Sequence, residues 1–242
     1  MLTIFRKELT AFFSSLIGYI AIAVFLILIG LIMWVFPNNV LDFGYANLDI
    51  LFDNAPLVFM LLIPAITMRL FAEEKKSGTL EIIATRPLTE LQIILGKYFA
   101  AFVLVIIALL PTLLYYYTVY MLAVPLGNID TGAINGSYLG LCLLSAAFIA
   151  IGLFASAITD NQIVAFILAA FLCFAWYLAF YAVSGLGLFA GKADAIIQQI
   201  GMQFHYASIS RGVVDSRDVI YFLSLIVIFI LCTKTALESR KW

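Results

Sequence analysis

The stretch RLFAEEKKSGTLEIIATRPLTELQIILGKY, from Arg69 to Tyr98, separates two long hydrophobic runs and carries positive charge at both ends. Its first part, Arg69 to Lys76, continues the helical pattern of the hydrophobic run before it. Ser77-Gly78 then interrupts the pattern, because glycine beyond a helix end readily adopts the left-handed conformation that closes the helix. The sequence therefore predicts that the hydrophobic run continues as a helix up to this point and that the chain turns at Gly78.

A second, short helix is expected after this turn. Thr79 has a side chain suited to an N-cap, and Glu81 in the first turn complements the positive end of the helix dipole. The helix, from Leu80 to Thr85, stops before Pro87, because the residue before proline is pushed out of the helical region. Thr89-Glu90-Leu91-Gln92 has the Thr-x-x-Gln form of a capping box and opens the next helix. We therefore expect a short helix held crosswise between two longer ones at a membrane surface.

The composition places the rest of the chain in a membrane. Of its 242 residues, 65% are hydrophobic and 11% charged, and the mean hydropathy is +1.12, whereas a soluble domain is about 25% charged. A membrane-spanning helix needs roughly 17–25 mostly apolar residues, and five of the six uncharged runs contain such a segment. The sixth, 54–68, extends to Phe71 if the charged end of Arg69 reaches the interface. The uncharged runs are 9–41, 54–68, 98–129, 131–159, 161–191 and 219–233.

Residues 1–13 place apolar side chains on one face of a helix and basic side chains on the others. The apolar face consists of Leu2, Phe5, Leu9, Phe12 and Phe13. This pattern indicates an amphipathic helix at the membrane surface, although a simple charged flank of the first span explains it equally well. Within the spans, the small residues of 138–158 are typical of a helix that packs closely inside a bundle.

The segment 185–218 is the largest stretch outside the predicted spans. Its helix-like part, 193–204, is too short to cross and is expected to lie in the outer leaflet. The charged groups that follow are expected to form ion pairs that fix the return into the last span, and the single histidine is expected to be a polar interface residue rather than a catalytic one. These candidate residues are His205, Arg211, Asp215, Arg217 and Asp218.

The distribution of lysine and arginine predicts the orientation. Ten lie on the side of the chain termini and the 69–97 loop, and three lie on the other side. Because basic residues accumulate on the cytoplasmic side, both termini and the loop are expected in the cytoplasm.

The 69–97 loop resembles the cytoplasmic loop of ABC-2-type transporter permeases. The resemblance is carried by Glu73-Glu74-Lys75-Lys76-Ser77-Gly78-Thr79-Leu80-Glu81, Arg86-Pro87-Leu88-Thr89 and Gly96-Lys97. In that family the loop contributes a coupling helix that docks on an ATPase subunit. The contact residues implied are Glu73, Glu74, Gly78, Thr79, Leu80, Glu81, Ile82, Ile83 and Pro87. Three further segments, 5–9, 205–218 and 238–242, resemble the F subunit of the gliding-motility permeases of Bacteroidetes-type bacteria.

The resemblance implies an all-α polytopic membrane protein with six transmembrane helices. It also implies an N-terminal connecting helix, a cytoplasmic coupling helix and outer re-entrant helices. Residues 1–242 would form a single permease domain, with the coupling loop at 69–97 and the re-entrant segment at 185–218. The implied partners are an ABC ATPase subunit, a second permease chain in a homo- or heterodimer, and a membrane protein of the gliding system. The implied location is the inner (cytoplasmic) membrane, with no nucleic acid involved.

The sequence lacks the motifs of an independent enzyme. Gly191-Lys192 has neither the preceding glycine nor the following Ser or Thr of a P-loop, so ATP hydrolysis would belong to a partner chain. We expect no catalytic residue, cofactor or metal, and the three cysteines are too far apart for a metal motif. Because the spans are nearly free of charge, an ATPase-driven permease is favoured over an ion-driven carrier. The alternatives are an ABC-2 permease for copper-enzyme maturation or drug export, and an ATPase-independent membrane scaffold.

Overall fold

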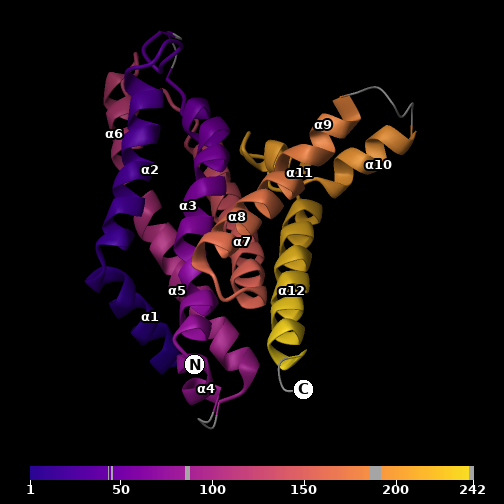
Figure 1. Ribbon diagram of the computed structural model, residues 1–242. Coiled ribbons are helices and arrows are strands. Elements are labelled where there is room, and N and C mark those ends of the chain that lie inside the picture. The colour runs from indigo at the N-terminus through magenta and orange to yellow at the C-terminus, as the bar shows by residue number, and fades with distance from the viewer. Residues whose placement is uncertain (43, 45, 85–87, 186–191, 240–242) are drawn as a thin grey trace.

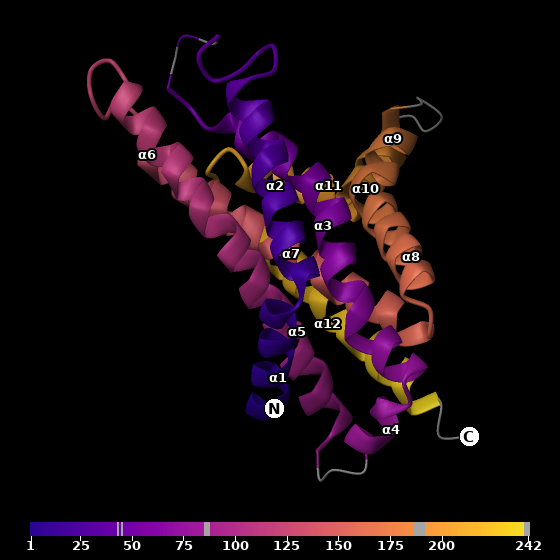
Figure 2. The ribbon, with the colours of Figure 1, turned by 60° about the vertical axis from the view of Figure 1, so that its left-hand side comes forward.

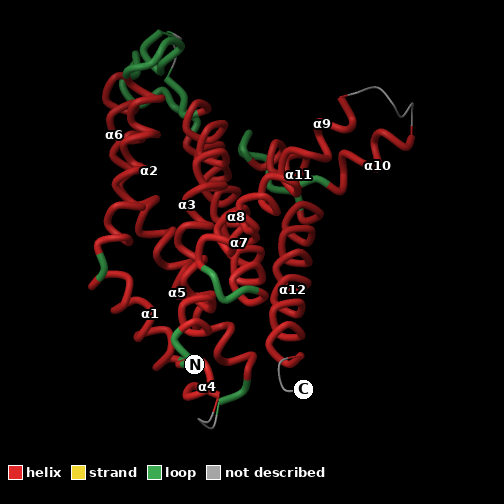
Figure 3. The backbone as a smooth tube through the Cα atoms, viewed as in Figure 1, coloured by secondary structure: helices red, strands yellow, loops and turns green. Residues whose placement is uncertain are grey.

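The computed structural model describes the whole chain except residues 43, 45, 85–87, 186–191 and 240–242, and the side chains of residues 17, 82–84 and 192–194 are not described either. Over the described residues every regular element is a helix (Figures 1 and 3). The predicted all-α class is therefore confirmed.

Within the described part of the chain, five helical stretches are long and apolar enough to cross a membrane. They are α3 (Asp49–Lys76), the stack of α5 (Glu90–Leu109), η1 (Leu110–Thr112) and α6 (Leu113–Leu122), α7 (Thr131–Ile158), the stack of α8 (Gln162–Phe174), η2 (Ala175–Ala179) and α9 (Phe180–Gly185), and α12 (Ser216–Glu238). A sixth crossing results if α1 (Leu2–Ser14) and α2 (Leu16–Trp34), which meet at a bend of 70°, count as one span. The 19 residues of α2 correspond to about 28 Å, close to the thickness of a bilayer's hydrocarbon core.

Helix α7 lies at the centre of the bundle, in contact with α3, α5, α8 and α12. Its glycines allow this close approach: a Cβ atom added at Gly152 would lie 2.1 Å from Oγ1 of Thr67 on α3. The buried Ser156 hydroxyl accepts hydrogen bonds from the Phe71 and Ala72 amides of α3 at 3.0 and 3.1 Å. The small residues of this span therefore serve packing within the bundle, as predicted.

The two ends of the bundle carry different short helices (Figures 1 and 2). The start of α1, the end of α12 and the short helix α4 (Thr79–Ala84) lie together at one end, which we call the α4 end. At the opposite end, α10 (Lys192–Ile200) and α11 (Met202–Ile209) fold back from α9 toward the start of α12. This arrangement places the start of α1 and the end of α12 on the same side of the bundle as α4.

The amphipathic helix α1 packs on α5 with a face that coincides only in part with the predicted one. Phe12 is buried and Leu9 packs against the core, as predicted, whereas Leu2 is 61% exposed. The buried face also contains Ile4 and Glu8, and the Glu8 carboxylate reaches a buried lysine of α5.

The re-entrant segment consists of two helices where the sequence predicted one over 193–204. The break is at Gly201, where the backbone is extended and an added Cβ atom would lie 2.9 Å from Cβ of Phe180. Neither the nine residues of α10 nor the eight of α11 could cross a membrane. The prediction that this segment returns without crossing is confirmed.

Candidate functional site

The turn between α3 and α4 forms as its sequence predicts. Gly78 has a φ of +71°, in the left-handed region that favours glycine. The Ser77 amide donates to the Glu73 carbonyl at 3.0 Å, and the Thr79 hydroxyl donates to the Glu74 carbonyl at 3.4 Å. Thr79 is thus the first residue of α4, one position before the predicted start, and its side chain ties α4 back to the end of α3.

The predicted capping box at the start of α5 is confirmed. The Gln92 amide donates to Oγ1 of Thr89 at 3.3 Å, and the Thr89 amide donates to Oε1 of Gln92 at 3.2 Å. Because this box satisfies amides that the helix leaves free, it fixes the residue at which α5 begins. The α4 segment is therefore bounded by a left-handed glycine on one side and a capped helix on the other.

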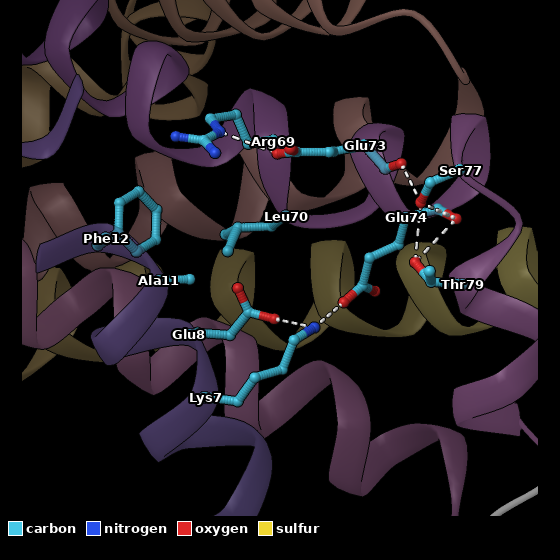
Figure 4. A pocket seen from close by; sticks show the side chains of 10 residues that line it. All are labelled: Lys7, Glu8, Ala11, Phe12, Arg69, Leu70, Glu73, Glu74, Ser77 and Thr79. Carbon is cyan, nitrogen blue, oxygen red and sulfur yellow. Dashed lines mark hydrogen bonds and ion pairs between the residues drawn. The ribbon is translucent and has the colours of Figure 1, made fainter. Parts of the chain in front are cut away.

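A cluster of four charged side chains joins α1, α3 and α5 next to this segment, and Figure 4 shows three of them, Lys7, Glu8 and Glu74. We call it the Lys97 cluster: Lys7, Glu8, Glu74 and Lys97. The Lys97 side chain is completely buried, and its Nζ lies 2.7 Å from Oε1 of Glu8 and 2.8 Å from Oε2 of Glu74. The same Nζ donates to the Leu70 carbonyl at 2.6 Å. Two of its three donor hydrogens therefore have an acceptor, and Oε2 of Glu74 compensates the charge of Nζ without forming a hydrogen bond to it.

Lys7 completes the cluster at its more exposed edge. Its Nζ bonds Oε1 of Glu74 and lies 3.2 Å from Oε1 of Glu8. Burial lowers the pKa of Lys7, but the hydrogen bond to Glu74 and the charges of Glu8 and Glu74 outweigh it, and the net effect is a raised pKa. The four charges sum to zero, so the cluster is neutral while each charge has an opposite partner. Removing one partner from such a buried set leaves an uncompensated charge, which is strongly destabilising.

Gly96 provides the space for this contact. A Cβ atom added there would lie 3.1 Å from Cβ of Ile4 on α1 and 3.1 Å from the Met1 carbonyl oxygen. Gly96 lets α1 approach α5, and the adjacent Lys97 then pairs with Glu8. The Gly96-Lys97 pair thus has a physical role in attaching α1.

Two expectations about charge need correction here. The resemblance implies that Glu74 lies on the surface that meets an ATPase, but its side chain is buried in the Lys97 cluster. The spans were also expected to be nearly free of charge, whereas Lys97 is the eighth residue of α5 and completely buried. The signal that could have revealed the cluster is that Glu8, Glu74 and Lys97 each lie at the edge of an apolar run, with complementary charges.

The other predicted contact residues of the α4 end are more exposed. Glu73 forms an ion pair with Arg69 at 2.9 Å and remains 47% exposed, and Glu81 on α4 is exposed. Leu80 is half-buried against the core. Pro87 and the side chains of Ile82 and Ile83 lie outside the described residues. Between α1 and the α3–α4 turn there is also a cavity of about 240 Å³ (Figure 4).

Arg69 links the bend between α1 and α2 to the same region. Its Nη1 donates to the Ser15 hydroxyl at 3.1 Å, and Ser15 is the residue between the two helices. The sequence predicts that Arg69 reaches from the end of a span to the interface, and this hydrogen bond identifies Ser15 as its partner there. The bend of α1, the end of α3 and the start of α5 are joined by polar contacts.

At the opposite end, the predicted ion pairs of the re-entrant segment are wrong. Within the described part of the chain neither Arg211 nor Arg217 forms an ion pair. Asp215 instead caps α12 by accepting from the Arg217 amide at 3.0 Å, and Asp218 lies 2.7 Å from Nδ1 of His205. A short capping side chain is satisfied by backbone amides, which is why Asp215 is not left for an arginine.

These residues line an open groove of about 970 Å³ at the start of α12. It also contains Tyr181, Phe204 and the glutamines of α10 and α11. Over the described residues no group of three or more His, Cys, Asp or Glu side chains could hold a metal ion.

The sequence pattern of a family described as ABC-2 family transporter protein matches residues 37–233. No curated protein matches the chain.

Proposed function

The chain belongs to the ABC-2 family of transporter proteins, and we propose that it is the membrane subunit of a transporter driven by a separate ABC ATPase. The whole chain would act as one permease domain. Membership in the family supports a transmembrane subunit that does not itself catalyse a reaction. The finer assignment rests on the α4 end.

The observation that carries the proposal is the attachment of α4 to the spans on both sides. Helix α3 runs without interruption for 28 residues to Lys76, and α4 follows after one turn at Gly78. Through the Lys97 cluster, α3 is joined to α5 and to α1. A displacement of α4 would therefore move two spans and the N-terminal helix together. A freely solvated loop would not need such an attachment.

The surface offered to the ATPase consists of the exposed part of the segment. Glu73 and Glu81 supply carboxylates for basic residues of the partner, and Ile82 and Ile83 on α4 supply apolar anchors. Gly78, Thr79, Leu80 and Pro87 complete the proposed contact set, and Gly78 and Thr79 also form the turn that positions α4. Glu74 is removed from the contact set because it belongs to the Lys97 cluster.

For orientation we propose that the α4 end faces the cytoplasm of the inner membrane. The support is that ten lysines and arginines lie on this side and only three on the other. The start of α1 and the end of α12 also lie on the same side of the bundle as α4 (Figure 2). The re-entrant helices would then lie in the outer leaflet. A second permease chain, identical or not, would complete the transporter.

For the biological system we propose gliding motility, with a further membrane protein of that system as partner. The support is the resemblance of the segments 5–9, 205–218 and 238–242 described above. Copper-enzyme maturation and drug export are the alternatives within the family, and they would be recognised by which chains accompany the permease.

The test is a purification of the tagged full-length chain from its native membranes, followed by mass spectrometry of the associated chains. We expect an ABC ATPase with the wild-type chain and its loss with the double variant Glu81→Lys, Ile82→Ala. Truncating an interface anchor typically costs about 2 kcal/mol or more, roughly 30-fold in affinity.

The matched control is Asp160→Lys. Asp160 is exposed in the turn between α7 and α8, which lies on the same side of the membrane, so charge reversal there should leave ATPase binding unchanged. If the ATPase stays bound to the double variant, α4 is not the docking helix. If no ATPase accompanies the wild type, the chain is a membrane scaffold.

A further inference from the structure

The only histidine of the chain is held between two hydrogen-bond acceptors. On α11, Nδ1 of His205 lies 2.7 Å from Oδ1 of Asp218 on α12, and Nε2 lies 2.9 Å from the Gln199 carbonyl oxygen of α10. The His205 and Asp218 side chains are only 12% and 10% exposed. One imidazole ring thus connects three helices.

Hydrogen-bond accounting determines the protons that this geometry requires. A neutral imidazole has one N–H, a carbonyl oxygen has none, and a carboxylate is a pure acceptor. With a neutral ring and an ionised Asp218, one of the two short contacts would join two lone pairs. The arrangement is satisfied only when the pair holds one more proton, as an imidazolium beside a carboxylate or as a neutral ring beside a protonated carboxyl.

We propose that His205 and Asp218 form a proton-dependent clasp that holds the α10–α11 re-entrant hairpin on α12. The clasp is the pair with its extra proton, together with the two contacts made by the ring. When the proton leaves, either the Nδ1 or the Nε2 contact becomes repulsive. Attachment of the hairpin is therefore favoured at lower pH and lost as the pH rises.

Neighbouring contacts concentrate the effect at the junction of the two helices. The Tyr221 ring of α12 stacks on His205 with centroids 3.8 Å apart, an arrangement that favours a cationic ring. Ile200 is the last residue of α10, and its carbonyl accepts a hydrogen bond from the Tyr221 hydroxyl at 2.5 Å. Both residues before Gly201 are thus held through their carbonyls, by His205 and by Tyr221, and release of the clasp would free the hairpin at its break.

The charges around the pair come from three elements, and over the described residues they are balanced. The groove around the clasp receives Arg211 from the loop after α11, Arg217 and Asp215 from the start of α12, and the uncharged Tyr181 from α9. Two arginines and one carboxylate besides Asp218 leave no surplus of negative charge to retain a proton. The proton is thus required by the contacts of the ring and not by a general acidic field.

The first measurement uses the fact that the chain contains one histidine. Full-length protein labelled with ¹⁵N-histidine gives a single pair of ring signals in a lipid bilayer, which show whether each nitrogen carries a proton. Nitroxide labels at Ile196→Cys on α10 and Ile220→Cys on α12, both exposed positions, report the distance of the hairpin from α12 by electron spin resonance. The three native cysteines are replaced by alanine for this purpose.

We expect the ring signals and the label distance to change over the same pH interval, with a longer distance at higher pH. Asp218→Asn is the decisive variant, because its amide can donate to Nδ1 of a neutral ring while Nε2–H still donates to Gln199. This variant should keep the hairpin attached with one proton on the ring and at least a tenfold weaker dependence of the distance on pH. Asp215→Asn, the matched change at the cap of α12, should behave like the wild type, because asparagine also caps helices.

Two results would overturn the clasp. One is a wild-type ring with a single protonated nitrogen beside an ionised Asp218, observed by ¹³C NMR of its carboxyl carbon, while the label distance is unchanged. The other is an Asp218→Asn variant that folds and still shows the wild-type dependence of the distance on pH. If Asp218→Asn does not fold, the wild type alone decides: the clasp holds if the ring protonation and the label distance change over the same pH interval, and it fails if they do not.

Discussion

At both ends of the bundle, buried charged or polar side chains attach short helices to the membrane spans, but the residues differ. At the α4 end, the Lys97 cluster attaches the short helix α1 to the spans α3 and α5, and α4 follows directly after α3. At the opposite end, His205 attaches α10 and α11 to α12. The Lys97 cluster is a neutral set of opposite charges, whereas the two contacts of the His205 ring require one more proton than a neutral ring and an ionised Asp218 hold. We therefore expect a permanent attachment at the first end and a proton-dependent attachment at the second.

This difference fits the tasks we propose for the two ends. A segment that transmits the movement of an ATPase has to move with its spans, and a neutral, closed set of four charges keeps it attached. The clasp that we propose at the other end would release the re-entrant hairpin from α12 when its extra proton leaves. A buried charged pair therefore need not serve stability alone, because the number of protons that its contacts require decides whether it can release a helix.

The largest effect is expected for Lys97→Met, which keeps the length of the side chain and removes its charge. Glu8 and Glu74 would then remain buried with only Lys7 near them, and breaking a buried pair costs about 3–5 kcal/mol. Thermal unfolding of the purified protein in detergent measures the loss. Lys234→Met is the control, since Lys234 is 41% exposed and its ion pair with Glu238 on the same helix is longer, at 3.5 Å, and also exposed. Equal effects of the two changes would show that burial of the cluster does not matter.

A smaller effect is expected for His205→Ala. The hydrogen bonds of a charged group contribute about 1.5–3 kcal/mol, and here they hold a hairpin rather than the core. Hydrogen exchange of the α10–α11 amides should therefore accelerate while the exchange of α7 stays unchanged. Because the clasp of the wild type needs a proton, the difference between variant and wild type should shrink as the pH rises. A difference that is independent of pH would contradict the comparison between the two ends.

The fold was predictable from the sequence to a large extent, and the reason is that its signals are local. Runs of apolar residues, Gly78 and the capping box at Thr89 each depend on a few neighbouring residues. Gly78 and the capping box predicted the adjoining helix ends within one position, whereas the apolar runs predicted the spans but not their ends, since α3 and α12 extend several residues beyond them. The break at Gly201 escaped prediction because it depends on the close approach of Phe180 from another helix.

The candidate site was less predictable, because its partners are distant in the chain. Glu8 and Lys97 are 89 positions apart, and only the packing of α1 on α5 brings them together. The same holds for His205, whose carboxylate partner comes from the next span. Proximity in the sequence suggested pairs between the arginines and the nearest aspartates. In the structure, Asp215 accepts from the Arg217 amide and Asp218 pairs with His205.

A third prediction concerns the boundary of the rigid α4 end. Thr89→Ala removes the capping box of α5, and the loss of such a cap costs about 1 kcal/mol. The variant should unfold at a slightly lower temperature, and the exchange of the first amides of α5 should accelerate. Thr235→Ala on α12 is the matched control, since its exposed hydroxyl only bonds the Cys232 carbonyl of its own helix. An unchanged exchange in α5 would mean that the Lys97 cluster alone defines its start.

The smallest change in stability is expected for Glu73→Gln, and it separates attachment from docking. Glu73 and Glu74 are neighbours on α3, yet one lies in an exposed pair with Arg69 and the other in the Lys97 cluster. Exposed pairs contribute about 0.2–1 kcal/mol, so Glu73→Gln should leave the unfolding temperature nearly unchanged, whereas Glu74→Gln should lower it clearly. If α4 docks on an ATPase as we propose, Glu73→Gln should nevertheless weaken binding of the ATPase, because its carboxylate faces outward. A stable Glu74→Gln variant together with an unstable Glu73→Gln variant would reverse the assignment, and the outward-facing carboxylate would then be the one that holds the bundle together.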